Sequence, residues 1–203
     1  MHTQLVSAQD PQAIPLALQI LRAGGLVAFP TDTVYGVGSL AFDQSAIESI
    51  YVAKDRPQEK AIPILIADLD NIEKVAVGIP PLARRLAARF WPGPLTIILS
   101  KHPDLPPAVS AITTVGVRVP DHPVARELLR ATGPMAVTSA NLSGRESPRN
   151  AMDVMGQLQG RIPLVVDGGE TPGGVASTVV DVTGAEPVIV RAGPVTLEQI
   201  KAT

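Results

Sequence analysis

The sequence predicts an α/β fold, in which a twisted mixed sheet is flanked by helices. Short apolar runs typical of buried strands alternate along the chain with segments whose apolar residues recur at helical spacing. Two β-branched segments near the C-terminus, 175–182 and 188–191, indicate a hairpin, so we expect antiparallel as well as parallel pairs. With 203 residues the chain can bury a sizeable core, and we expect a single domain over residues 1–203.

Helix signals consist of a capping side chain or a proline, followed by apolar residues three or four positions apart. The first predicted helix begins at Asp10–Pro11 and ends at Gly24–Gly25. The other predicted helices begin at Asp43, at Pro80–Pro81, at Asp121 and at Thr196, where Gln199 completes a capping box. The apolar runs between the helices predict strands at 26–29, 62–66, 95–99, 115–119, 135–138 and 164–166, in addition to the hairpin.

Composition excludes several classes of protein. The chain has no cysteine, which excludes disulfide frameworks, thiolate zinc sites and cysteine nucleophiles. The net charge of −2 creates no global basic field for nucleic acid, and 3% aromatic residues offer few platforms for stacked bases. The three histidines stand in unrelated contexts, so we expect no protein metal site. Apolar runs fall far short of the about 20 residues that span a bilayer, and the polar N-terminus is unlike a signal peptide, so we expect a cytoplasmic protein without membrane contact.

Polar segments follow several of the predicted strands. Residues 30–38, PTDTVYGVG, directly follow the first strand, at the end where α/β sheets bind ligands; a flexible turn is the alternative interpretation. Lys54, Arg56 and Lys60 bring three cations between a helix and a buried strand. Such cations suit phosphates or a carboxylate, but they are also favoured at the solvated C-terminus of any helix.

Further polar residues stand at the ends of later strands. Arg118 interrupts an apolar strand near its carboxyl end, which indicates either an edge residue or a paired, buried charge. Residues 138–144, TSANLSG, offer small hydroxyl and amide groups to an anion or nucleotide, and Arg191 ends the last strand as Arg118 ends its own. The chain contains no Walker A, G-x-S-x-G, H-E-x-x-H or Rossmann fingerprint.

Seven segments together resemble the YrdC/Sua5 family, the threonylcarbamoyl-AMP synthases. They occur in the family's order and span about residues 30–194: PTDTVYGVG, KDRPQEK, WPGPLTIIL, VGVRVPDHP, TSANLSGRESP, GGVASTVVD and VRAGP. No single segment is decisive, but seven in order are highly specific. Longer family members add a C-terminal domain, and this chain, which stops at Thr203, is similar to the short form.

The resemblance implies an enzyme, a nucleotidyltransferase that condenses L-threonine, bicarbonate and ATP to threonylcarbamoyl-AMP and pyrophosphate. A partner complex would then transfer the threonylcarbamoyl group to adenosine 37 of tRNAs that read ANN codons. The resemblance also implies a twisted α/β sheet with a concave, positively lined cavity. Mg²⁺ is expected to arrive bound to ATP, because the sequence shows no dedicated carboxylate cluster.

Residue roles follow from matching the family's motifs position by position. The residues that would contact threonine are Thr31, Arg118, Thr138 and Thr178, with Arg118 clamping the carboxylate. The expected catalytic pair that faces the triphosphate is Lys54 and Arg56. The other expected nucleotide contacts are Thr114, Ala140 through its backbone, Ser147 and Arg191.

Two other functions stay open. A double-stranded RNA-binding module would use a concave basic surface to accept RNA by shape, and the resemblance leaves room for weak RNA binding. The acidic pI of about 5.9 and the few aromatic residues count against RNA binding as the main role. A carbamoyl-phosphate-using carbamoyltransferase domain is the second alternative, because related domains occur in hydrogenase-maturation enzymes. Those enzymes are far longer and carry zinc-finger parts, which this cysteine-free chain lacks.

Overall fold

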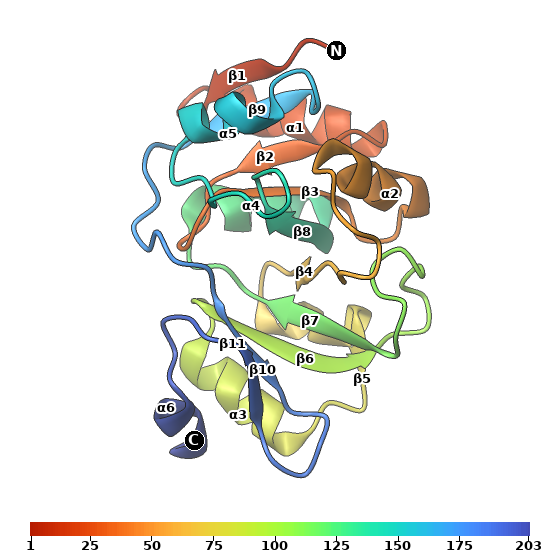
Figure 1. Ribbon diagram of the computed structural model, residues 1–203, viewed down its shortest axis with the longest axis vertical. Helices are drawn as coiled ribbons and strands as arrows, with labels where there is room; N and C mark the ends of the chain where they lie inside the picture. Colours follow the sequence, from red (N-terminus) through yellow and green to blue (C-terminus); the bar gives the residue numbers. More distant parts are fainter.

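The computed structural model describes residues 1–203 and joins eleven strands in one sheet (Figure 1). Neighbouring strands follow the order β1-β9-β2-β3-β8-β4-β7-β6-β10-β11, and β5 pairs with β6 outside this path. The pairs β1–β9, β2–β9, β4–β7 and β6–β10 are parallel and the others antiparallel, which confirms the predicted mixed sheet and its C-terminal hairpin, β10–β11. The strands are β1 (Gln4–Ser7), β2 (Val27–Phe29), β3 (Gly36–Leu40), β4 (Ile64–Leu65), β5 (Ala76–Val77), β6 (Leu95–Lys101), β7 (Thr114–Arg118), β8 (Met135–Ser139), β9 (Leu164–Asp167), β10 (Thr178–Asp181) and β11 (Val188–Arg191).

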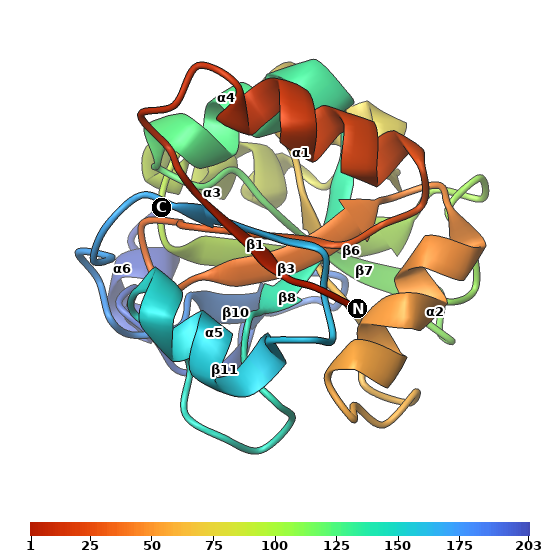
Figure 2. The same ribbon diagram turned by 90° about the horizontal axis from the view of Figure 1, so that it is seen from above.

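Helices cover the sheet on both faces. Figure 2 shows α1 and α4 on one face and α2 and α5 on the other. The helices are α1 (Ala13–Arg22), α2 (Gln44–Ala53), α3 (Pro81–Phe90), α4 (Pro123–Thr132), α5 (Ala151–Leu158) and α6 (Leu197–Lys201), with a 3₁₀ helix over Leu69–Lys74. None of them combines the length and the apolar composition that crossing a bilayer requires.

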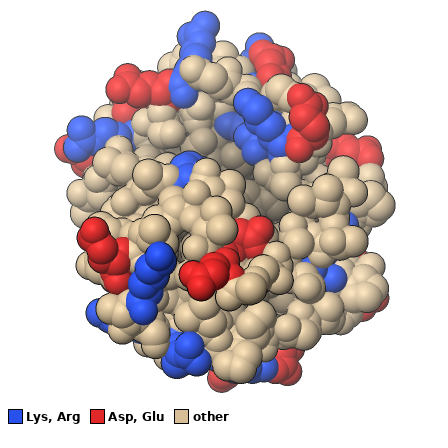
Figure 3. All heavy atoms as spheres, turned by 60° about the horizontal axis from the view of Figure 1, so that its bottom comes forward, with Lys and Arg blue, Asp and Glu red and all other residues tan.

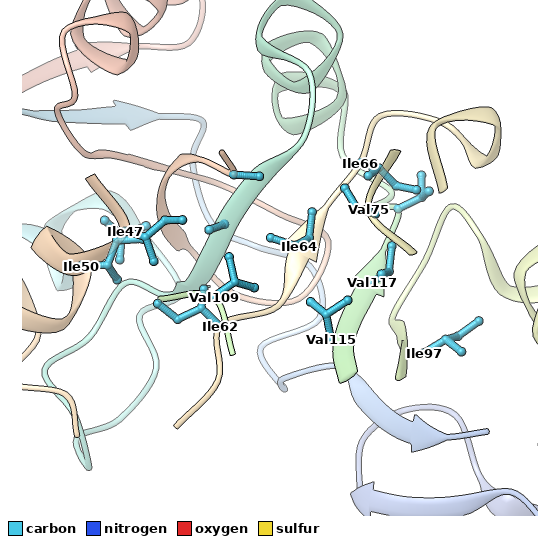
Figure 4. Close-up of a cluster of buried hydrophobic side chains, with 14 of the residues drawn as sticks. Ile47, Ile50, Ile62, Ile64, Ile66, Val75, Ile97, Val109, Val115 and Val117 are labelled. Carbon is cyan, nitrogen blue, oxygen red and sulfur yellow. The ribbon is translucent and has the colours of Figure 1, made fainter. Parts of the chain in front are cut away.

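The main core lies under the central strands, because their residues alternate between two faces. Leu95 and Ile97 of β6, Val115 and Val117 of β7 and Val180 of β10 all lie in this core, at most 2% exposed. Figure 4 shows how the cluster continues from these strands through Ile64 to Ile47 and Ile50 of α2. The intervening residues of the same strands face the opposite side, where they line a cavity.

A second core cluster lies between α1 and α4. Ala13, Ala17 and Leu21 recur on one side of α1 and are fully buried. They belong to the same cluster as Ala125 and Leu128 of α4, and the two helices are in direct contact. The buried residues of α1 therefore recur at helical spacing, as the packing of an amphipathic helix requires.

Two of the predicted helix caps are confirmed and two are wrong. The Asp43 carboxylate accepts a hydrogen bond from the backbone N–H of Ala46 (3.0 Å), and Thr196 forms the complete capping box. Asp10 instead accepts from the N–H of Gln12 (2.8 Å), and this turn delays the start of α1 to Ala13. Asp121 is replaced as N-cap by His122, because Pro123 takes the first helical position.

Five elements were not expected: β1, β3, β5, α5 and the 3₁₀ helix. The segment predicted as a ligand-binding loop, 30–38, contains the start of β3, which lies between β2 and β8. A β-carbon on Gly36 would lie 2.7 Å from Val137 Cγ1, so glycine permits the close approach of β3 to β8. Glycine is depleted in strands, and the pattern therefore favoured a loop.

Candidate active site

A cavity of about 660 Å³ lies on the face of the sheet opposite the main core. Its volume falls in the range of about 300–1,000 Å³ that is typical of small-molecule sites. Its walls come from the loop before β3 and from β4, β6, β7, β8, β10 and β11, together with the segment that follows α2. No carboxylate lines the cavity, whereas four cationic side chains do: Arg56, Lys60, Arg118 and Arg191.

Arg118 occupies the carboxyl end of β7 and is 6% exposed. Its Nε donates to Gly93 O (2.9 Å), Nη1 donates to Thr33 Oγ1 (3.0 Å), and Nη2 donates to the Asp32 carboxylate. These bonds use three of the five guanidinium N–H groups, which leaves two for a ligand. Burial lowers the pKa of Arg118, and the neighbouring Asp32 carboxylate opposes that effect. Of the two alternatives for Arg118, the structure selects the paired, buried charge.

The loop before β3 is ordered by its own hydroxyl groups. Thr31 Oγ1 donates to Val34 O (2.6 Å) and accepts from the backbone N–H of Thr33 (3.2 Å). Because its single proton is used, the hydrogen bond between the Thr31 and Thr33 hydroxyls (3.0 Å) must be donated by Thr33. This chain of bonds ends at Arg118, so the loop and the guanidinium form one rigid polar wall.

Arg56 reaches the cavity because of how α2 ends. Asp55 adopts a positive φ of 49°, and the N–H of Arg56 donates to Tyr51 O (2.9 Å), which is the bond that closes a Schellman turn. The guanidinium then donates to Lys60 O (3.2 Å) and Ala61 O (2.9 Å). Burial lowers the pKa of Arg56, and the charge of Arg191 lowers it further. The two arginines therefore feel each other's charge across the cavity.

Arg191 is held against the neighbouring strand by Ser177. Its Nε and Nη2 donate to Ser177 O (3.0 and 2.9 Å), and Nη2 also contacts Ser177 Oγ (3.0 Å). The Ser177 hydroxyl in turn pairs with Thr96 Oγ1 (2.8 Å). No carboxylate pairs with Arg191 or Arg56, so their charges are available to an anion.

Other groups in the lining have free hydrogen-bonding capacity or fill space. The hydroxyls of Thr138 and Ser139, at the end of β8, have no hydrogen-bond partner within the protein. Gly116 of β7 keeps the floor open, because a β-carbon there would lie 2.9 Å from Thr96 Cγ2. Tyr35 contributes a buried phenol that donates to Gly169 O (2.7 Å), and burial raises its pKa to about 12. The phenol is therefore protonated at neutral pH.

The cavity brings together residues that the sequence placed far apart. Of the residues expected to contact threonine, Thr31, Arg118 and Thr138 line it. Of the residues expected to contact the nucleotide, Arg56 and Arg191 line it. The contacts of these side chains with substrates stay predictions.

Two of the side chains expected to contact substrates, those of Lys54 and Thr178, do not line the cavity in this structure, and their substrate contacts stay predictions. Lys54 is 1% exposed, and its ammonium donates to the carbonyl oxygens of Ser139 and Asn141. Thr178 is fully buried, and its hydroxyl donates to Val195 O (2.8 Å) and accepts from Val195 N (2.9 Å). The alternation of β10 explains the second case, because Thr178 points to the core while the preceding Ser177 faces the cavity.

Thr114, Ala140 and Ser147 also lie outside the lining. Thr114 begins β7 on the same face as Arg118 but at the far end of the strand, opposite Ser100. The backbone N–H of Ala140 donates to Tyr35 O (2.8 Å), so it is not free for a nucleotide. Ser147 follows in the loop between β8 and α5.

Four further residues take part in the site but were not predicted from the sequence: Asp32, Thr33, Thr96 and Ser177. Asp32 and Thr33 lie inside the segment that was singled out, but nothing in the sequence shows which of its hydroxyls and carboxylates meets Arg118. Thr96 is a polar residue in an otherwise apolar strand, and this signal could have identified it. Ser177 and Thr178 both carry a hydroxyl group, so the sequence does not show which of them faces the cavity. The direction in which each side chain points from the strand decides it.

Charges on the face of the molecule drawn in Figure 3 are mixed in sign. Figure 3 shows lysine and arginine side chains beside aspartate and glutamate side chains on one face, with no large area of a single sign. No group of three or more histidine, aspartate or glutamate side chains is arranged to hold a metal ion.

Comparisons with known proteins show which family the chain is similar to. The family model for Sua5, YciO and YrdC proteins, described as "Telomere recombination", matches residues 19–193. A threonylcarbamoyl-AMP synthase of Bacillus subtilis is 47% identical, over 98% of this chain and 58% of that protein. A putative threonylcarbamoyl-AMP synthase of Mycobacterium tuberculosis is 40% identical, over 98% of this chain and 94% of that protein.

The fold is also similar to a solved structure. The crystal structure of Sua5 from Pyrococcus abyssi complexed with L-threonine superposes with a TM-score of 0.94 and 41% identity. The superposition covers 100% of this chain and 60% of that one. The chain thus spans less than two thirds of the B. subtilis and P. abyssi relatives.

Proposed function

Because the chain belongs to the Sua5/YciO/YrdC family, we propose that it is a threonylcarbamoyl-AMP synthase that uses L-threonine, bicarbonate and ATP. One observation carries the proposal beyond family membership. A single cavity combines a rigid polar wall around Arg118 with cations that no carboxylate neutralises. Such a cavity suits an amino acid at one end and a triphosphate at the other.

The proposed reaction has two steps. The threonine amine combines with bicarbonate to give a carbamate, and water leaves. A carbamate oxygen then attacks the α-phosphorus of ATP, the bond to the β-phosphate breaks, and pyrophosphate departs. No protein nucleophile is needed, so the task of the protein is to position the reactants and stabilise the developing negative charge.

At the amino-acid end, the two free N–H groups of Arg118 are the proposed donors to the threonine carboxylate. The Thr138 and Ser139 hydroxyls, which have no protein partners, suit the hydroxyl of the substrate side chain. Thr31 has a different proposed role, because its hydroxyl proton is already donated to Val34 O. It shapes the wall that the substrate meets.

At the nucleotide end, Arg56, Lys60 and Arg191 are the proposed partners of the triphosphate. Their charges strengthen the binding of pyrophosphate as it departs, which lowers the barrier of the second step. Mg²⁺ bound to ATP would neutralise part of the same charge, held by phosphate oxygens and water. The absence of carboxylates from the lining fits a cation that arrives with the nucleotide.

The proposed product is a mixed anhydride and therefore labile. We propose a cytoplasmic tRNA threonylcarbamoyl transfer complex as the partner that consumes it, which would modify adenosine 37 in tRNAs that read ANN codons. Weak RNA binding by this chain itself would serve such a transfer, although mixed surface charges do not favour it (Figure 3).

The test is incubation of the purified chain with ATP, Mg²⁺, L-threonine and labelled bicarbonate. We expect label in an adenylate and release of pyrophosphate only when threonine and bicarbonate are both present. Pyrophosphate release at the same rate without threonine would contradict the proposal. Turnover with carbamoyl phosphate in place of threonine and bicarbonate would favour the carbamoyltransferase alternative. A salt-dependent RNA gel shift without ATP turnover would favour the RNA-binding alternative.

A further inference from the structure

One threonine and one serine of the cavity, Thr96 and Ser177, form a hydroxyl pair that the proposed mechanism leaves without a role. Thr96 belongs to β6, Ser177 directly precedes β10, and both residues line the cavity. They are 3% and 4% exposed, and their hydroxyl oxygens lie 2.8 Å apart. Polar groups buried this deeply require hydrogen-bond partners, so every donor and acceptor of the pair has to be accounted for.

The pair keeps one hydroxyl proton that no protein atom accepts. Each hydroxyl has one proton to donate and two lone pairs that accept. Arg191 Nη2, which can only donate, contacts Ser177 Oγ (3.0 Å) and uses one of its lone pairs. If Ser177 donates to Thr96, the Thr96 proton is left over, and if Thr96 donates to Ser177, the Ser177 proton is left over. In either direction one proton remains, and both residues that can carry it line the cavity.

The side chain of Thr96 is held in one orientation by the neighbouring strand β7. A β-carbon on Gly116 would lie 2.9 Å from Thr96 Cγ2, so the methyl group of Thr96 occupies the space that this glycine leaves. The hydroxyl of Thr96 points instead toward Ser177. Because β-branched side chains are stiff about χ1, the position of the methyl group also fixes the position of the hydroxyl.

The pair lies between the two ends of the cavity. Figure 1 shows β6 between β7 and β10. The register of the antiparallel β6–β7 pair, in which Ile97 lies opposite Val117, continues to Thr96 and Arg118. On the other side of Thr96, the Ser177 hydroxyl connects it to the guanidinium at the end of β11. One hydroxyl pair thus connects the wall of β7 with the wall of β11.

We propose that Thr96 and Ser177 are catalytic residues that act as one hydrogen-bond donor, with a single shared free proton, to the α-phosphate as it is attacked. The inference rests on the proposed function, which assigns the Arg118 end of the cavity to threonine and the opposite end to the triphosphate. The carbamate must meet the α-phosphate between these ends, where the pair lies. Both reacting groups are anions, so a donor placed between them offsets their repulsion as they approach.

The pair takes no part in the covalent changes. A carbamate oxygen forms the bond to the α-phosphorus, and the bond from that phosphorus to the oxygen shared with the β-phosphate breaks. The electron pair of the broken bond leaves with pyrophosphate. The shared proton stays on its own hydroxyl and donates to a non-bridging oxygen of the α-phosphate, on which negative charge is held in the transition state.

The first experiment compares Thr96→Val, Ser177→Ala and the double variant in threonine-dependent pyrophosphate release. Each single variant keeps one hydroxyl whose proton is free, so we expect kcat to fall by only about threefold to fivefold. The double variant has no such proton, and we expect kcat to fall by about a hundredfold to a thousandfold. Arg191 stays held in Ser177→Ala, because two of its bonds go to the backbone oxygen of residue 177. A double loss equal to the product of the single losses would show two independent donors and would overturn the proposal.

Two controls separate the lost donor from lost packing or stability. Thr3→Val removes a buried threonine hydroxyl outside the cavity, which donates to Ile162 O (2.6 Å), and we expect its kcat to be unchanged. Thr96→Ser combined with Ser177→Ala keeps one hydroxyl and loses only a methyl group. We expect its kcat to match that of Ser177→Ala to within about twofold. Equal losses in this variant and in the double variant with valine would mean that Thr96 only fills space, which also overturns the proposal.

The division of the effect between kcat and KM locates the donor in the reaction. A donor that acts in the transition state lowers kcat when it is lost, so we expect the affinity of the double variant for a non-hydrolysable ATP analogue to stay within about threefold. A loss that appears only in KM, with kcat unchanged, would show that the pair binds a ground-state substrate and would overturn the proposal. If the wild-type chain is active and the double variant equally active, this inference alone fails. If the wild-type chain releases no pyrophosphate, the proposed function fails and the inference fails with it.

Discussion

Two walls of the same cavity differ in whether a carboxylate pairs with their cations. On the Arg118 wall, formed by Thr33 and Arg118, the guanidinium is buried and neutralised by the carboxylate of Asp32, which does not itself line the cavity. On the Arg56–Arg191 wall, the guanidinium groups contact only carbonyl oxygens and a serine hydroxyl, and no carboxylate pairs with them. The charge of the first wall is therefore neutralised within the protein, whereas the charges of the second wall have no counter-charge in the protein.

The difference shows how charge and geometry divide the work of binding. A neutralised pair presents directed N–H groups with little net charge, which suits a substrate that must be oriented. Arg56 and Arg191 lack carboxylate partners, and the charge of Arg191 lowers the pKa of Arg56, so an incoming anion relieves that repulsion. Such a wall suits a highly charged group such as a triphosphate.

The largest effect is expected from breaking the Arg118 wall. Arg118→Ala leaves Asp32 buried without its partner, and we expect the free energy of unfolding to fall by about 3–5 kcal/mol in a denaturant titration. Threonine binding, followed by calorimetry, should weaken in the same variant. Adding Asp32→Asn should recover part of the stability, because an amide leaves no buried charge. Arg22→Ala, at an exposed site on α1, is the control, and equal losses in the two single arginine variants would contradict the comparison.

The Arg56–Arg191 wall should respond in binding and not in stability. We expect Arg56→Ala and Arg191→Ala each to weaken ATP binding by about tenfold to a hundredfold, because a hydrogen bond to a charged group contributes about 1.5–3 kcal/mol. Threonine affinity and the unfolding midpoint should change little. The measurements are titration calorimetry with a non-hydrolysable ATP analogue and thermal melting. A wild-type affinity for the analogue in both variants would mean that these arginines are solvated surface residues that do not bind the nucleotide.

The titration of Lys54 extends the comparison to a buried cation that does not line the cavity. The pKa of Lys54 is lowered from 10.5 to about 7, so between these values the unfolded chain binds the proton more tightly than the folded chain. The free energy of unfolding should therefore rise with pH in this window, by at most about 1.4 kcal/mol per pH unit. Denaturant titrations at several pH values should show a shallower slope in Lys54→Met. Identical slopes would mean that Lys54 titrates as an exposed lysine does.

The smallest effect is expected where α2 delivers Arg56 to the cavity. Asp55 holds a positive φ of 49°, which favours glycine, and its ion pair with Arg161 (2.9 Å) is largely exposed. We expect Asp55→Gly to raise the free energy of unfolding by about 0.5–1 kcal/mol and to leave ATP affinity unchanged. Asp55→Ala is the control, since it loses the same ion pair without gaining the backbone freedom. A loss of ATP affinity in Asp55→Gly would show that the Asp55 side chain itself positions Arg56.

Local signals in the sequence identified the elements whose formation depends on neighbouring residues. Asp43 and Thr196 cap helices as expected, since capping involves side chains within three positions of the backbone they satisfy. β1 and β3 were missed for a different reason. β1 consists of four mostly exposed residues that pair with β9, more than 150 positions away, and β3 contains two glycines, Gly36 and Gly38, that permit its close approach to β8.

The sequence by itself determined the mixed α/β class and the main segments from which the cavity is built. Tertiary structure alone decided which side of each strand meets the cavity. Alternation requires Ser177 and Thr178 to point in opposite directions, but only the sheet's packing on the main core turns Thr178 inward. It also brought Asp32 to Arg118 and directed Lys54 to the carbonyl oxygens of the β8 turn. These contacts join residues 85 or more positions apart, and no local pattern encodes which distant partner will satisfy a buried charge.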